Sequence, residues 1–217
     1  MVTVLGTEIQ NRSIEEKRIT FHNLSWQAYQ QISSALGESC KARLTFDRDT
    51  LEMVMPLEVH EFAARLIERF IIALAVELRM PIKTMGSTTL DREDLLRGAE
   101  PDDAYYIQNQ PLVAGRDINL QNDPPPDLIV EIDITHTDIN KLSLYAAFGV
   151  PEFWRYDGQV WRIYQLQGEY YLEVEASPTF PNVPKQRLYS FLEQARLDEI
   201  GAEVDLRAWV RQELLAG

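Results

Sequence analysis

The sequence has little cysteine and histidine and no long apolar run. Its single cysteine, Cys40, excludes an intrachain disulfide, and its three histidines, His22, His60 and His136, do not have the spacing of a zinc site. No stretch approaches the roughly 18 apolar residues of a membrane span, and residues 1–17 lack the basic and apolar regions of a signal peptide. We therefore expect a cytoplasmic protein with no membrane partner, in which any metal is held by oxygen atoms.

Positive charge is also scarce, with 21 Lys and Arg against 34 Asp and Glu and a formal net charge of −13. This balance counts against a protein that coats nucleic acid, because nonspecific affinity comes largely from cations that neutralise phosphates. It does not exclude a local basic groove. The hydrophobic content of 45% indicates a globular protein that is neither disordered nor fibrous.

The apolar periodicity predicts one domain over residues 22–217, after a flexible tail over residues 1–21. Its parts are an N-terminal helix and hairpin (22–57), a core (58–166) and a C-terminal strand with helices (167–217). The predicted elements are a helix over 25–36, a hairpin over 42–55, a long helix over 59–80, strands near 83–90, 103–107 and 127–134, a short helix up to 148, strands over 150–156, 160–166 and 170–175, and helices over 190–195 and 205–215. This order predicts an α/β (α+β) fold, a mixed sheet flanked by helices.

Local signals set several of these boundaries. Asn23 or Ser25 can cap the first helix, and Gly37 ends it. Thr137 or Asp138 can cap the short helix, which stops at a second glycine, Gly149.

Glu131 is an ionisable residue inside a predicted buried strand, where the chain reads DLIVEIDI from Asp127 to Ile134. Burying an unpaired carboxylate costs several kcal/mol, so the fold must supply a metal ion or a partner such as Lys141 or an arginine. The period of two places Asp127, Glu131 and Asp133 on one face of this strand. The sequence therefore predicts a cation beside Glu131, either a metal or a side chain.

Asp102 stands at the start of the preceding predicted strand, although it could merely open a turn after Pro101. If the two strands are neighbours, Asp102 and Glu131 converge. Two hard oxygen donors with room for water suit Mg²⁺ or Mn²⁺, and such a site suits phosphodiester hydrolysis. The pair is thus a candidate metal site of a hydrolase.

Lys141 follows Glu131 by ten residues, with Tyr145 one turn later on the same helix face. A cation at this place could orient an attacking water or stabilise a phosphoryl transition state, and it could equally be a solvated residue or a salt-bridge partner. No serine or cysteine nucleophile motif and no glycine-rich phosphate loop competes with this interpretation.

Several motifs together resemble the Uma-two family of restriction-endonuclease-like proteins, within the PD-(D/E)xK nuclease superfamily. They are EPDDAYYI (100–107), PPDLIVEIDIT (125–135) and KLSLYAAFGVPEFWRYDG (141–158), supported upstream by SWQAYQQI (25–32) and RLTFDRDTLEMVMP (43–56). The resemblance covers most of the chain. It implies a four-stranded mixed sheet with flanking helices, preceded here by the N-terminal helix and hairpin.

The resemblance also implies a metal-dependent endonuclease that acts on DNA. By position, Asp102 and Glu131 are the implied ligands of Mg²⁺ or Mn²⁺. The superfamily lysine normally stands two residues after the glutamate, where this chain has Asp133, and a lysine from the following helix, here Lys141, is implied to substitute.

Three further acidic residues are candidates for the site: Asp127 and Asp133 on the strand, and Glu77 on the long helix. Asp127 could instead simply begin its strand, and Glu77 could lie on an exposed face. Strands after Val150 offer an edge through which two copies could pair as a homodimer, as many nucleases of this fold do.

A different class of function, a binding or assembly module on a nuclease fold with little turnover, fits the acidic charge and the displaced lysine. A third, a small-molecule phosphodiesterase, fits the acidic surface. A basic groove beside the carboxylates would favour nucleic acid, whereas a large exposed apolar patch near Phe153 or Trp154 would favour an interaction module. His60 and His136 are interpreted as surface or helix-end residues, and Trp154 and Trp161 as packing residues.

Overall fold

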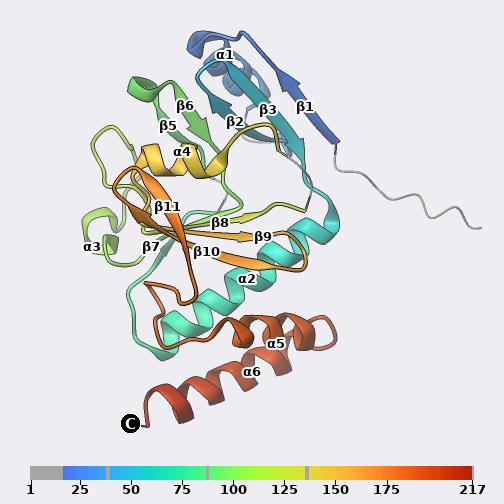
Figure 1. Ribbon diagram of the computed structural model, residues 1–217, viewed down its shortest axis with the longest axis vertical. Helices are drawn as coiled ribbons and strands as arrows, with labels where there is room; N and C mark the ends of the chain where they lie inside the picture. Colours follow the sequence, from blue (N-terminus) through green and yellow to red (C-terminus); the bar gives the residue numbers. More distant parts are fainter. Residues whose placement is uncertain (1–16, 38–39, 87, 135–136, 217) are drawn as a thin grey trace, which may run out of the picture.

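The computed structural model describes residues 17–37, 40–86, 88–134 and 137–216, which form two β-sheets with helices around them (Figure 1). The larger, which we call the central sheet, has six strands. In spatial order they are β11 (Tyr170–Val174), β10 (Trp161–Gln167), β9 (Glu152–Tyr156), β8 (Leu128–Ile132), β7 (Asp103–Tyr106) and β4 (Lys83–Thr84). Strands β8 and β9 are parallel and the other pairs antiparallel. The predicted mixed sheet is confirmed, with six strands where the resemblance implied four.

Helices cover both faces of the central sheet. Helix α2 (Glu58–Glu77) lies on one face, and α5 (Lys185–Ala195) and α6 (Glu199–Trp209) pack beyond it (Figure 1). The 3–4 spacing of Leu66, Phe70 and Leu74 turns one apolar stripe of α2 onto the sheet. Helix α4 (Lys141–Phe148) covers the opposite face. Two short helices, α3 (Gln110–Val113) and the 3₁₀ turn Glu93–Leu95, lie in connections, and a π-helical turn, Val210–Leu214, extends α6.

None of the helices in the described ranges is long and apolar enough to cross a membrane.

The smaller sheet, which we call the N-terminal sheet, is antiparallel and carries α1 (Trp26–Leu36). Its strands in spatial order are β1 (Lys17–Phe21), β3 (Thr50–Met55), β2 (Arg43–Asp47), β6 (Arg97–Ala99) and β5 (Leu90–Arg92). Tyr29 of α1 stacks on Phe46 with ring centroids 4.8 Å apart. The predicted hairpin is therefore part of a sheet that two later strands complete.

The tail predicted over residues 1–21 is corrected at its end. Residues 17–21 form β1, which pairs along its length with β3, because alternate side chains such as Arg18 turn inward, where Arg18 pairs with Glu52. Residues 1–16, the rest of the predicted tail, lie outside the described residues.

Three predicted helix boundaries hold and one is corrected. The Ser25 side chain accepts a hydrogen bond from the Ala28 amide, and Gly37 and Gly149 end their helices with positive φ angles of 66° and 77°. Helix α4 is capped by Asn140, whose side chain accepts from the Ser143 amide at 3.0 Å. The predicted caps, Thr137 and Asp138, were wrong, because the Thr137 hydroxyl donates to Glu52 and the Asp138 carboxylate accepts from the Thr20 hydroxyl instead.

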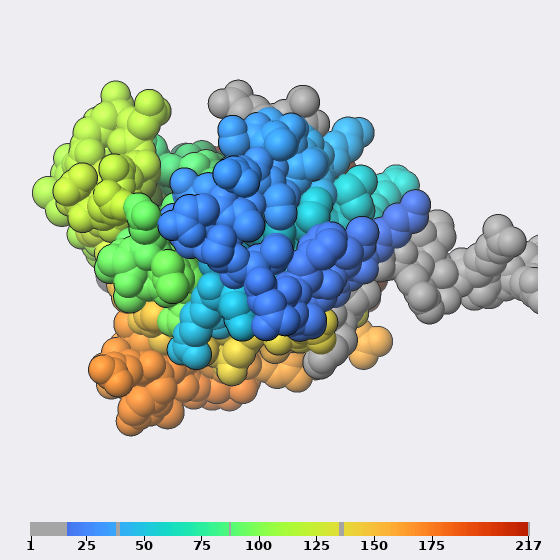
Figure 2. Space-filling model, turned by 90° about the horizontal axis from the view of Figure 1, so that it is seen from above, coloured from blue at the N-terminus to red at the C-terminus, as the bar shows by residue number. Residues whose placement is uncertain are grey.

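The N-terminal sheet lies above the central sheet in Figure 1 and is fixed to α4 and to the segment that leads into it. Seen from above, the N-terminal residues cover the middle of the molecule (Figure 2). Glu52 of β3 accepts hydrogen bonds from the Thr137 hydroxyl at 2.9 Å and the Asp138 amide at 3.0 Å. Arg97 of β6 bridges Asp47 at 2.7 Å and the Ser143 carbonyl at 3.3 Å. These contacts hold the N-terminal sheet over the end of β8.

Candidate active site

Asp102 and Glu131 face each other on adjacent strands, as predicted. Strands β7 and β8 pair with Asp103 opposite Val130, so the same register places Asp102 opposite Glu131. The amide of Ile132, the next residue after Glu131, donates to Asp102 Oδ2 at 2.6 Å. Both residues are buried. The strand pairing itself therefore brings the two candidate ligands together.

Glu131 is paired with the side chains of the following helix. Lys141 Nζ lies 2.7 Å from Glu131 Oε2, and the Tyr145 hydroxyl donates to Oε1. Glu131 is only 3% exposed, and burial raises its pKa, partly offset by the charge of Lys141. Burial and then the charge of Glu131 raise the pKa of Tyr145, so that hydroxyl stays a donor. The side-chain partner that the sequence left open for Glu131 is Lys141.

Asp133 holds the other side of Lys141. Lys141 Nζ lies 2.8 Å from Asp133 Oδ1, and Arg155 Nε lies 3.0 Å from Oδ2. Burial alone would raise the pKa of Asp133, but Lys141 and Arg155 outweigh it and keep that pKa below its usual range. Burial favours the neutral form of Lys141, yet the attraction of Glu131 and Asp133 raises its pKa. Lys141 is therefore a charged lysine fixed between two carboxylates.

Asp102 has two neighbours that the sequence did not identify. Arg43 of β2 forms an ion pair with Asp102 Oδ1 and lies 2.7 Å from Glu61 with its other nitrogen. His60 Nε2, on α2, lies 3.3 Å from Asp102 Oδ2. His60 lies in the first turn of α2 and is therefore a helix-end residue, one of its two predicted positions, but its side chain is buried against Asp102 and is not on the surface. Asp102 is thus part of a charged cluster and more than a turn residue.

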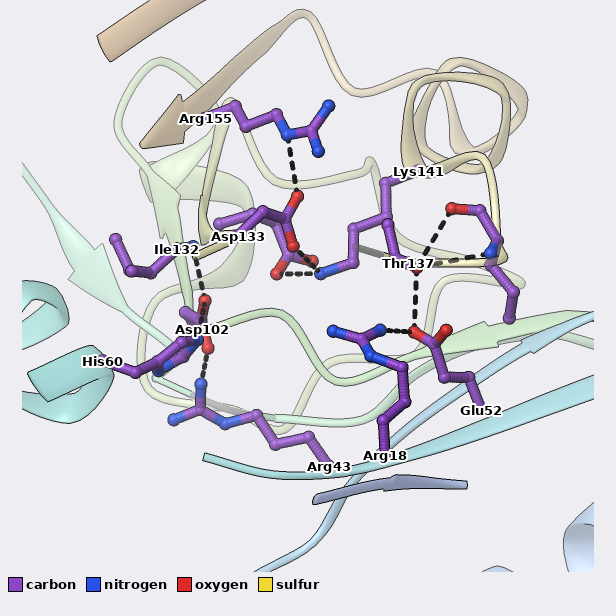
Figure 3. A network of polar contacts seen from close by, with 12 residues as sticks. Arg18, Arg43, Glu52, His60, Asp102, Ile132, Asp133, Thr137, Lys141 and Arg155 are labelled. Carbon is purple, nitrogen blue, oxygen red and sulfur yellow. Dashed lines mark hydrogen bonds and ion pairs between the residues drawn. The ribbon is translucent and has the colours of Figure 1, made fainter. Parts of the chain in front are cut away.

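These side chains surround a small cavity of about 20 Å³. Figure 3 shows Arg18, Arg43 and Glu52 reaching it from the N-terminal sheet, opposite Asp133 and Lys141. A volume of this size holds about one water molecule. The cavity therefore lies between the N-terminal sheet and the carboxylates of the central sheet.

Two of the additional candidates lie elsewhere. Asp127, at the other end of β8, accepts hydrogen bonds from the Ile107 amide at 2.6 Å and the Asn109 amide at 2.9 Å, and so fixes the loop after β7. Glu77, in the last turn of α2, lies 2.7 Å from Arg211. Neither lines the cavity. The position of Asp133, in contrast, is at the site as expected.

The donor set can be compared with the needs of a divalent metal. The described residues contain no group of three or more His, Cys, Asp or Glu side chains arranged to hold a metal ion. Mg²⁺, however, commonly takes only one or two carboxylates and completes its shell with water and substrate phosphate. Asp102 and Glu131 supply such carboxylates beside a cavity of water size. The site fits Mg²⁺ or Mn²⁺ in donor type and place, on condition that Arg43 leaves Asp102 Oδ1.

Asp103 lies next to the site, and its burial should make the free energy of unfolding depend on pH. Burial, and then the charge of Glu68, raises the pKa of Asp103 from 3.8 to about 7. Between these pH values the folded chain holds a proton that the unfolded chain has released, so stability falls as pH rises from about 4 to about 7. We expect Asp103→Asn to remove the contribution of Asp103 to this fall, and to make the chain more stable than wild type at pH 8 by on the order of 2–4 kcal/mol.

Urea unfolding at pH 4.5 and pH 8 in EDTA measures this difference. Asp117→Asn, an exposed aspartate, is the control and should follow the wild-type profile. Equal pH dependence in wild type and Asp103→Asn would contradict the assignment.

Comparison with known proteins places the chain in a family. The model of the Uma2 (Uma-two) family, described as "Putative restriction endonuclease", matches residues 26–196. The crystal structure of a "putative nuclease belonging to DUF820" from Anabaena variabilis ATCC 29413 matches with a TM-score of 0.52 and 17% identity, over 77% of this chain and 98% of that one. No curated protein matches the chain. The family match and the shared fold support a nuclease, and the chain belongs to the Uma2 family.

Proposed function

We propose that this protein is an endonuclease that hydrolyses the phosphodiester bonds of DNA with Mg²⁺ or Mn²⁺ held by Asp102 and Glu131. One observation carries the proposal. Two buried carboxylates from neighbouring strands meet beside a charged lysine, in a chain whose family is described as restriction endonucleases. Charged groups are costly to bury, so a fold that keeps three of them together has a use for their charge.

A bound divalent ion would stabilise the charge that develops on the phosphoryl oxygens and would lower the pKa of water. Hydrolysis adds the oxygen of a water molecule to phosphorus and breaks one ester bond, which leaves a phosphate end and a hydroxyl end. Asp102 and Glu131 contribute hard oxygen donors to this chemistry.

Lys141 contributes a fixed positive charge. Its ammonium group has three donors, and Glu131 and Asp133 accept two of them. The third can donate to a phosphate oxygen or to the attacking water, where it would stabilise negative charge in the transition state. Asp133 is a positioning residue, because it acts through Lys141, and Tyr145 has the same role for Glu131.

Arg43 competes with the metal for Asp102. We expect Arg43→Met to raise the affinity for Mn²⁺ by on the order of 10-fold, because the guanidinium paired with Asp102 repels a second cation at the same carboxylate. Isothermal titration of the protein with Mn²⁺ measures this affinity directly.

Arg65→Met is the matched control. It removes the same charge nearby, but Arg65 pairs with Glu68, at 2.8 Å, and not with Asp102. Its Mn²⁺ affinity should equal that of wild type. Weaker binding by Arg43→Met than by Arg65→Met would show that Arg43 supports the ion site and does not oppose it.

The function is tested by incubating supercoiled plasmid, linear duplex and single-stranded DNA with the protein in EDTA, Mg²⁺ or Mn²⁺. The proposal expects cleavage only with a divalent ion, and products that carry one phosphate and one hydroxyl end. No cleavage with either ion on any DNA would favour the alternative, a nuclease-fold binding module. Saturation of Asp102 and Glu131 by protein donors is the observation that favours that alternative.

A further inference from the structure

A large groove, which we call the α1–α2 groove, opens onto the candidate active site. It has a volume of about 1160 Å³ and runs between the end of α1, the start of β2 and the start of α2. Ser33 and Leu36 line it on the α1 side, and Glu58 and Arg65 on the α2 side. A groove of this volume can take a ligand of several hundred daltons or a segment of a polymer.

The α1–α2 groove and the carboxylate cavity share a wall. Arg43, Pro56 and Glu100 line both spaces. The Arg43 guanidinium lies between them, paired with Asp102 on one side and Glu61 on the other. A polymer that lies in the groove therefore passes directly beside the carboxylates, separated from them by one side chain.

The groove has cations suited to phosphates. Lys41 and Arg65 line it in addition to Arg43. Among the described residues Lys41 has no ion pair, and Arg65 is two-thirds exposed in an i,i+3 pair with Glu68, which holds it only weakly. Three carboxylates also line the groove: Glu61 pairs with Arg43, Glu100 accepts from the Leu44 amide and the Thr89 hydroxyl, and Glu58 is exposed at the start of α2. Lys41 and Arg65 are therefore the lining cations that a phosphate group could contact.

The N-terminal sheet limits which molecules can reach Asp102 and Glu131. Asp102 is 5% exposed and Glu131 3% exposed, and the N-terminal sheet is held by Glu52 to the segment before α4 and by Arg97 to α4 itself. A DNA duplex is stiff over about 150 base pairs and presents its two strands as one thick unit. A single strand can bend at every nucleotide and lie along a groove.

We propose that the α1–α2 groove binds a single-stranded polynucleotide by its phosphate backbone and leads it to the active site. The choice of ligand rests on the proposed function. No aromatic side chain is among the described residues that line the groove, so bases have nothing to stack on there. Recognition is therefore by charge and width, and without sequence preference.

Binding is measured by fluorescence anisotropy in EDTA, where the proposed hydrolysis does not occur. The probes are a labelled 12-nucleotide single strand of mixed sequence and the duplex of the same sequence. We expect the single strand to bind at least 10-fold more tightly than the duplex. With Lys41 and Arg65 as the available cations, the slope of log affinity against log salt should be about −1.4.

Lys41→Ala and Arg65→Ala should each reduce this slope to about −0.7 and weaken binding to all sequences alike. Lys185→Ala, on α5 and outside the groove, is the matched control and should bind as wild type does. Thermal unfolding confirms that each variant is folded. Equal affinity for single strand and duplex, or no effect of the two groove variants, would overturn the inference.

The same proteins are then tested for cleavage with Mg²⁺. Metal-dependent cutting of duplex DNA that the groove variants do not slow would leave the proposed function standing and remove the groove inference. Single-strand binding without cutting by any metal would remove the proposed function and leave the groove as a binding site.

Discussion

Glu131→Gln is expected to lower the rate of metal-dependent DNA cleavage by about 10³-fold, since a metal ion contributes several kcal/mol of transition-state stabilisation. The amide has nearly the shape of the carboxylate and can still accept from Tyr145, but it lacks the charge that holds a divalent ion and Lys141. The initial rate at saturating Mg²⁺, on whichever of the plasmid, duplex and single-stranded substrates the wild type cuts, measures the loss.

Glu77→Gln is the control for this experiment. It makes the same chemical change at a glutamate that the sequence also suggested and that the structure places with Arg207 and Arg211, outside the cavity. It should cut at the wild-type rate. Equal rates for wild type and Glu131→Gln would exclude Glu131 from the catalytic site.

Lys141→Met is expected to lower the free energy of unfolding by about 3–5 kcal/mol, because it leaves buried carboxylates without their cation. Glu131 loses its only ion-pair partner among the described residues, while Asp133 retains Arg155. Urea unfolding in EDTA at pH 7.5 measures the change. The double variant Glu131→Gln with Lys141→Met should recover part of the loss, since it removes the uncompensated charge as well.

The loss should also depend on pH. Burial raises the pKa of Glu131, and removal of Lys141 raises it further, so protonation at low pH relieves the uncompensated charge. The deficit of Lys141→Met against wild type should therefore be smaller at pH 5 than at pH 8. Lys185→Met, which removes a lysine from the first turn of α5, should show neither effect. A small, pH-independent deficit for Lys141→Met would contradict the buried charge cluster.

The centre of the site could be predicted from the sequence because its signals are local. Glu131 interrupts an apolar strand, and the period of two puts it on the same face as Asp133. The two predicted strands follow one another along the chain, so they were expected as possible neighbours. In the structure β7 and β8 pair, and their register places Asp102 opposite Glu131. Lys141 was found through its position in a family motif.

The rest of the site depends on contacts between distant segments, which no local pattern reveals. Arg43 reaches Asp102 across 59 residues of sequence only because β2 joins the N-terminal sheet above the central one. His60 reads as polar on an amphipathic helix, yet its face of α2 meets Asp102. Residues 97–99 are too short and too rich in small residues to predict a strand, although they pair on both sides.

Asp127 and Glu77 lie away from the cavity, each with other partners. Asp127 has the right face by periodicity, but it lies at the opposite end of β8 from the cavity, where the loop after β7 needs an acceptor for its amides. Glu77 was assigned from its place on the core helix, and the arginines that pair with it lie at the C-terminal end of the chain. Periodicity gives the face of a residue and not its depth along the sheet.

The measurement that tests the central claim most directly is the anomalous diffraction of crystals soaked in Mn²⁺. The account predicts one strong peak at about 2 Å from carboxylate oxygens of both Asp102 and Glu131, with the Arg43 side chain moved off Asp102. A peak elsewhere, or no peak between these residues at an Mn²⁺ concentration that supports cleavage in solution, would contradict it.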